Sequence, residues 1–199
     1  MSRHTIYFVR HGQTDWNAAR RMQGQIDIPL NEIGRGQAKR NGETLREALG
    51  AKAAGLHYVA SPLSRASETM SLIRTALALP TPEHATDEFP KDHRLKEMHY
   101  GAWEGMMWPR HAERTPQIAW WLEDPWLRAT PGGESYAMLW ARVVAWLQEL
   151  ERDTVVVAHG GIMRVLRGHW LGMQPKEFVR LDVPQDKVLV LTAGAEAWL

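Results

Sequence analysis

Four short apolar runs along the chain predict four buried β-strands. They cover residues 5–9, 56–60, 154–158 and 187–192. Each run is about as long as an average strand. Runs with few polar residues are typical of strands that are covered on both faces of a sheet.

Apolar residues recur with a helical period between these runs. The pattern predicts four helices, over residues 31–49, 63–79, 135–152 and 161–171. Asn31 is a suitable cap for the first helix, and Pro80 ends the second.

The intervening segments are harder to interpret. Residues 83–96 suggest a short strand followed by a loop. Residues 101–133 contain four prolines and several tryptophans, and predict an excursion of short helices that serves as a lid.

The alternation of strands and helices indicates the α/β class, with a mainly parallel sheet and helices on both faces. No linker, repeat or low-complexity tract divides the 199 residues. We therefore expect one domain over residues 1–199.

Composition narrows the functional classes. The 24 basic residues nearly balance the 23 acidic ones, unlike the basic excess of a general nucleic-acid binder. There is no cysteine, which excludes thiolate catalysis and cysteine-ligated metal. No apolar run is long enough to span a membrane, and we expect no signal peptide, because only four residues precede the first predicted strand. We expect a cytoplasmic protein without metal or cofactor, and we predict no nucleic-acid or membrane partner.

The chain also contains 10 tryptophans, and Trp103, Trp108, Trp120, Trp121 and Trp126 lie close together in sequence. Core or lid packing explains such a cluster, but an apolar substrate wall or a subunit contact explains it as well.

Two histidines follow two of the predicted strands. Arg10-His11-Gly12 follows the first strand, and His159-Gly160 follows the third. In open α/β sheets, ligands bind beyond the carboxyl ends of the strands. The helix after His159 directs its N-terminal amides to the same edge, which favours an anion and makes Gly160 a candidate substrate contact.

These residues suit phosphoryl transfer. A neutral His11 is a candidate nucleophile if one ring nitrogen is tied to the backbone. Arg10 and Arg65 are candidate phosphate clamps, and a protonated His159 would add a donor. Glu97 is the candidate acid–base group. A single histidine at a strand end is usually structural, but two with an adjacent arginine favour a site.

At this point several motifs resemble the signature of the histidine phosphatase (phosphoglycerate mutase-like) superfamily. The chain reads Val-Arg-His-Gly-Gln-Thr-Asp-Trp-Asn over residues 9–17 and Ser-Pro-Leu-Ser-Arg-Ala-Ser-Glu-Thr over residues 61–69. The resemblance continues at residues 23–24, 27–34, 95–105 and 159–161.

The resemblance implies a three-layer α/β/α sandwich and a phosphohistidine intermediate on His11. It assigns the phosphate pocket to Arg10, Arg65 and His159, and the acid–base role to Glu97. It alone implies that Asn17 contacts the phosphoryl group and that Gln23 and Gly24 belong to a substrate-contacting loop.

Within the superfamily we expect a phosphatase that acts on a small-molecule phosphomonoester, as a monomer or a homodimer. Cofactor-dependent mutases typically have other residues at Met98, Ser64 and Gly161. Their carboxylate-binding basic cluster has no clear counterpart here, unless Arg110, Arg114 and Arg128 supply it. The alternatives are such a mutase, or a catalytically silent protein that binds a phosphate ligand.

Overall fold

The computed structural model describes residues 4–80 and 89–199 of the chain. Its centre is a five-stranded sheet with the order β2-β3-β1-β4-β5. The strands are β1 (Ile6–Arg10), β2 (His57–Ala60), β3 (Thr154–Ala158), β4 (Val188–Thr192) and β5 (Ala195–Trp198). β2, β3 and β1 run parallel to one another. β4 runs antiparallel to β1, and β5 runs antiparallel to β4.

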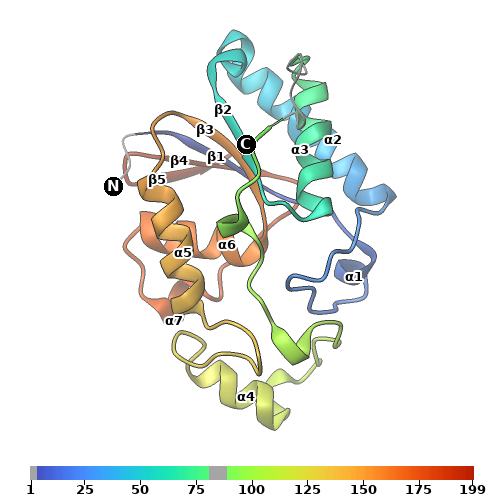
Figure 1. Ribbon diagram of the computed structural model, residues 1–199, viewed down its shortest axis with the longest axis vertical. Helices are drawn as coiled ribbons and strands as arrows, with labels where there is room; N and C mark the ends of the chain where they lie inside the picture. Colours follow the sequence, from blue (N-terminus) through green and yellow to red (C-terminus); the bar gives the residue numbers. More distant parts are fainter. Residues whose placement is uncertain (1–3, 81–88) are drawn as a thin grey trace.

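Helices cover both faces of the sheet (Figure 1). The helices are α1 (Asp15–Ala18), α2 (Glu32–Leu49), α3 (Ser64–Ala76), α4 (Pro116–Glu123), α5 (Tyr136–Gln148), α6 (Gly160–Trp170) and α7 (Pro175–Phe178). α2 and α3 pack on one face, where Val155 and Val157 point, and α5 and α6 pack on the face of Phe8 and Val156. This alternation gives two apolar cores and confirms the predicted α/β/α sandwich.

The register of the parallel strands aligns their carboxyl ends. Arg10 pairs with Ala158, and Ala60 pairs with Val157 on the next strand. The residues that follow these three strands therefore lie at one edge of the sheet, as the sequence predicts.

The four predicted strands and four predicted helices are all present, with ends displaced by a few residues. Asn31 caps α2 by accepting a hydrogen bond from the Gly34 N–H. α3 ends at Ala76, before Pro80, because Ala78 takes a positive φ of 52°.

Several details differ from the sequence prediction. The loop after β1 contains the short helix α1, which Thr14 caps. β4 runs antiparallel to its neighbours, and β5 has no predicted counterpart. Of the strand predicted in residues 83–96, residues 83–88 lie outside the described residues, and the remainder holds a bridge at Lys91 and a 3-10 turn over His93–Leu95.

Residues 101–133 form the expected excursion of short helical segments, with α4 at the far end of the molecule from α2 (Figure 1). Trp103 and Trp121 are buried in the core, whereas Trp120 lies exposed beneath the Arg128 guanidinium. Packing therefore accounts for much of the tryptophan cluster. Within the described ranges, no helix is long and apolar enough to cross a membrane.

Candidate active site

Three loops meet at the carboxyl edge of the parallel strands. The backbone N–H of His11, after β1, donates to the Ala158 carbonyl at 2.9 Å. The N–H of Ser61, after β2, donates to the Val157 carbonyl at 3.0 Å. These continuations of the sheet place His11, Ser61 and His159 side by side on a rigid base.

The His11 ring has one tied nitrogen and one free nitrogen. Nδ1 lies 2.7 Å from the Gly12 carbonyl oxygen and must carry a proton to bond it. Burial, with Arg65 and Arg10 nearby, holds the pKa of His11 well below its usual value. The ring is therefore neutral at neutral pH, and Nε2 keeps its lone pair.

Gly12 packs closely against the start of α2. A Cβ at Gly12 would lie 2.2 Å from the Gly34 carbonyl oxygen at the start of α2. The glycine is thus required because α2 packs directly against the loop that carries His11.

His159 is fully buried against His11, with 5.0 Å between the ring centroids. Burial, Arg65 and His11 lower its pKa well below the usual value, so the ring is neutral at neutral pH. Nε2 lies 2.8 Å from Ser61 Oγ, which itself accepts from the Leu63 N–H at 3.4 Å. If the Ser61 hydroxyl donates to Nε2, then Nδ1 of the neutral ring carries the proton and is a donor.

Arg10 and Arg65 are held by backbone carbonyls. Arg65 donates to Ile26 and Gly24 at 2.9 and 2.8 Å, and Arg10 donates to Val183 at 2.6 Å. Burial lowers the pKa of Arg10 to about 10, against the attraction of Glu97, so the guanidinium stays charged at neutral pH.

Three buried nitrogen atoms beside His11 have no hydrogen-bond partner among the described residues. They are Arg10 Nε, Arg65 Nε and His159 Nδ1. Buried donors are rarely left unpaired unless a ligand or water completes them. These three nitrogens come from the end of β1, from α3 and from the residue before α6. With His159 Nδ1 protonated, all three are N–H donors, which suit an anion.

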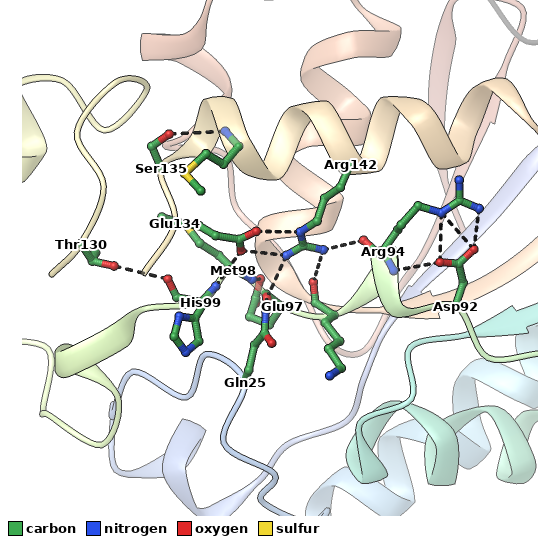
Figure 2. Close-up of polar contacts among 12 residues, drawn as sticks. Gln25, Asp92, Arg94, Glu97, Met98, His99, Thr130, Glu134, Ser135 and Arg142 are labelled. Atoms are coloured by element: carbon green, nitrogen blue, oxygen red, sulfur yellow. Dashed lines mark hydrogen bonds and ion pairs between the residues drawn. The ribbon is translucent and has the colours of Figure 1, made fainter. Parts of the chain in front are cut away.

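The Glu97 carboxylate lies at the start of α6. Its two oxygens accept from the Gly161 N–H at 3.1 and 3.2 Å, and Oε1 also accepts from the Met98 N–H at 2.8 Å. The backbone on both sides of Glu97 is held by Arg142 and Glu134 (Figure 2).

A cavity of about 700 Å³ opens over this edge. All the predicted site residues except the buried His159 line this cavity. The lining residues predicted from the sequence are Arg10, His11, Arg65, Glu97, Asn17, Gln23, Gly24 and Gly160. Gly24 has a φ of +54°, and its carbonyl is one of the two that hold Arg65.

The wall of the cavity beyond the proposed phosphate clamps is mostly basic. Arg20, Arg21 and Arg164 line it, together with one acidic residue, Asp182, and with Trp108 from the excursion. Arg110, Arg114 and Arg128 do not line it, so the basic cluster comes from other positions than the sequence suggested. Within residues 4–80 and 89–199, no carboxylate forms an ion pair with Arg20 or Arg164.

A family model described as histidine phosphatase superfamily (branch 1) matches residues 6–199. The chain belongs to this superfamily. The prediction of a histidine phosphatase is thereby confirmed at the level of the family.

Two curated relatives of this histidine phosphatase are named as phosphatases, and another is named as a 2,3-bisphosphoglycerate-dependent phosphoglycerate mutase. A metal-independent phosphoserine phosphatase of Arabidopsis thaliana is 34% identical over 81% of this chain and 66% of its own length, just under two thirds. A glucosyl-3-phosphoglycerate phosphatase of Mycolicibacterium vanbaalenii is 35% identical over 84% of this chain and 74% of its own length.

Two solved structures are similar to this chain in both fold and sequence. A mycobacterial glucosyl-3-phosphoglycerate phosphatase in complex with VO3 has a TM-score of 0.75 and 31% identity, over 98% of this chain and 96% of its own. YhfR of Bacillus stearothermophilus has a TM-score of 0.76 and 28% identity, over 94% and 90%.

The sequence missed several residues that position the site of this histidine phosphatase. Gln185 donates to both the His11 carbonyl and Asn17 Oδ1 at 3.0 Å. Ser61 orients His159, and Arg142 holds the backbone of Glu97. Ser61 directly follows a predicted strand, which was a usable signal, but Gln185 and Arg142 lie far from their partners in the sequence.

Proposed function

We propose that this histidine phosphatase hydrolyses small-molecule phosphomonoesters through a phosphohistidine intermediate on His11. The observation that carries the proposal is the neutral His11 ring, whose free Nε2 lies beside three unpaired N–H donors. Arg10 and Arg65 supply the positive charge that phosphoryl transfer requires. The name of the Arabidopsis relative, a metal-independent phosphatase, is consistent with this arrangement.

In the first step, His11 Nε2 attacks phosphorus as the bond to the ester oxygen breaks. Glu97, carrying a proton, gives it to the leaving alkoxide. In the second step, water attacks phosphorus and Glu97 takes its proton, so that the P–N bond breaks and inorganic phosphate leaves. Arg10, Arg65 and His159 Nδ1 donate to the phosphoryl oxygens in both steps.

The nucleophile is tested by rapid acid–base quenching with a phosphomonoester labelled on phosphorus. We expect the wild-type protein to carry an acid-labile, alkali-stable label. His11→Ala should lose both label and turnover, because the other ring at the site, His159, does not line the cavity. An acid-labile label that persists in His11→Ala would contradict the mechanism.

We further propose that the alcohol part of the substrate carries a second anionic group. The support is a group of three arginines, Arg20, Arg21 and Arg164, which line the cavity beyond the proposed phosphate clamps. None of the three forms an ion pair with a carboxylate among the described residues. Arg164 is anchored through Nε to the Leu181 carbonyl at 2.9 Å. The substrates named for two relatives, phosphoserine and glucosyl-3-phosphoglycerate, both carry a carboxylate.

A matched pair of substrates tests this preference. 3-Phosphoglycerate carries a carboxylate where glycerol 3-phosphate carries a hydroxymethyl group, and the two esters are otherwise alike. We expect kcat/KM about 10–100-fold higher for 3-phosphoglycerate, since a charge-assisted contact is worth about 1.5–3 kcal/mol. Equal values would contradict the second anion.

Phosphorus NMR of the same reactions separates the phosphatase from the alternative functions. Growth of free phosphate from either substrate supports the phosphatase. Growth of 2-phosphoglycerate without free phosphate would indicate the mutase instead. Binding of both esters without turnover would indicate the silent binding protein.

A further inference from the structure

Glu97 lies in a segment without regular secondary structure. Residues 96–100 belong to no helix or strand, so their backbone groups have no neighbouring strand to bond. An irregular segment is a poor support for a group that must transfer a proton, because small displacements of a catalytic group cost much of its effect.

Arg142, on α5, replaces the missing strand partner (Figure 2). Its Nη1 donates to the carbonyls of Arg94 and Lys96, the latter at 2.7 Å. Its Nη2 donates to the Glu97 carbonyl at 3.0 Å. One guanidinium thus binds three carbonyls of the segment that leads into the carboxylate.

Glu134 completes the arrangement from the other side. Arg142 Nε and Nη2 each lie 2.9 Å from a different oxygen of Glu134, which makes a bidentate pair. The Glu134 carboxylate also accepts from the His99 N–H at 2.9 Å. With these bonds, all five N–H donors of Arg142 are used, and the backbone is held on both sides of Glu97.

We propose that Arg142, together with Glu134, is the positioning device for the Glu97 carboxylate. The pair holds the backbone at residues 94–99, and α6 holds the carboxylate through the Gly161 N–H. Held at both ends, the carboxylate faces the cavity where the leaving oxygen departs. The inference rests on the proposed function, in which Glu97 protonates that oxygen.

A merely structural ion pair predicts something different. Its loss would lower the stability of the fold and reduce activity on all substrates alike. Loss of a positioning device slows mainly those substrates whose leaving group needs a proton. Aryl phosphates need little protonation, whereas alkyl phosphates need it fully.

The test compares Arg142→Lys and Glu134→Gln with a matched control, Arg94→Lys. Lysine keeps the charge of Arg142 but has three donors and no planar fork. Arg94 also forms a bidentate pair, with Asp92 at 2.8–3.2 Å, but its side chain does not touch Glu97.

We measure kcat/KM for glycerol 3-phosphate and for 4-nitrophenyl phosphate. We expect Arg142→Lys and Glu134→Gln to lose about tenfold or more on the alkyl ester and at most about threefold on the aryl ester. Glu97→Gln should show the same selectivity, and adding Arg142→Lys to it should cause no further loss. Arg94→Lys should behave as the wild type.

A second measurement reads the position of the carboxylate directly. The amide resonances of Gly161 and Met98, the two N–H groups that Glu97 binds, should shift in Arg142→Lys and Glu134→Gln but not in Arg94→Lys. Two results would overturn the inference. One is that the amide resonances do not shift in Arg142→Lys and Glu134→Gln. The other is that these two variants lose activity equally on both esters while Glu97→Gln loses mainly activity on the alkyl ester.

The two measurements also distinguish failure of the inference from failure of the proposed function. Shifted amides with no ester selectivity, in Glu97→Gln as well, would mean that Arg142 positions a carboxylate that is not the acid. If Arg142→Lys does not fold, the milder Glu134→Gln decides by the same two criteria.

Discussion

Replacing Gly161 by alanine should disable Glu97 without altering the glutamate itself. A Cβ at Gly161 would lie 2.4 Å from Glu97 Oε1 and 3.1 Å from Leu139 Cδ2. Alanine is otherwise acceptable at this position, the second residue of α6. The substitution therefore acts mainly by pushing the carboxylate away from the helix N-terminus.

The size of the effect follows from the contacts. An ordinary contact between the new carbon and Oε1 needs at least 3.4 Å, so the carboxylate must retreat by about 1 Å. That retreat breaks the bonds from the Gly161 N–H, now 3.1 and 3.2 Å long. Displacement of a catalytic group by about 1 Å can cost up to about 100-fold in rate, so we expect a loss of about 10–100-fold.

Steady-state hydrolysis of glycerol 3-phosphate is the assay, with thermal unfolding to verify that the variant folds. Gly36→Ala is the matched control, because its Cβ would lie 3.4 Å from the flexible end of Arg40. It should leave kcat/KM unchanged and raise stability by about 0.5–1 kcal/mol. If Gly161→Ala keeps kcat/KM within about twofold of the wild type, the reasoning about Glu97 is wrong.

Two further predictions concern the buried histidines. Because the pKa values of His11 and His159 are depressed, the unfolded state binds more protons below pH 6.5, and the free energy of unfolding should fall there by up to about 1.4 kcal/mol per pH unit for each ring. The stabilising effect of the two neutral rings is complete above pH 6.5 and is lost as the pH falls. Urea unfolding between pH 7 and pH 5 should therefore show a smaller loss of unfolding free energy in His159→Asn than in the wild type. An equal loss in both proteins would contradict the assignment. Ser61→Ala should lower kcat about tenfold by freeing the His159 tautomer. Nitrogen NMR of the ring should then show a changed tautomer, whereas unaltered turnover would refute this role for Ser61.

The sequence predicts the strands well where apolar residues form a continuous run. β5 was missed because Ala195–Trp198 alternates exposed and half-buried residues and contains no such run. Its signal was the turn at Ala193-Gly194, where both residues have a positive φ, of 41° and 84°. β4 and β5 form a hairpin, and β4 also runs antiparallel to β1. Strand propensity does not indicate the direction in which a strand runs.

The residues that the structure gathers at the cavity could be proposed from the sequence because they directly follow strands or belong to recognisable motifs. Apart from Ser61, the residues that orient them could not, because a hydrogen bond between distant segments leaves no local pattern. Gln185 lies 174 residues from His11, and Arg142 lies 45 residues from Glu97. Such partners become visible only when the fold brings them together.

The proposed site has one half that binds the phosphate and one half that binds the alcohol part of the ester, and different parts of the fold hold them. Residues that carry out the reaction are thus distinct from residues that select the substrate. The proposed phosphate half consists of His11, His159 and the two arginine clamps, which are fixed by the ends of parallel strands and by backbone carbonyls. The proposed alcohol half is lined by Arg20, Trp108 and Arg164, which come from a loop, from the excursion and from α6. Substitutions in the alcohol half should therefore change which ester is preferred while leaving phosphohistidine formation intact, because the sheet edge that holds the nucleophile does not depend on them.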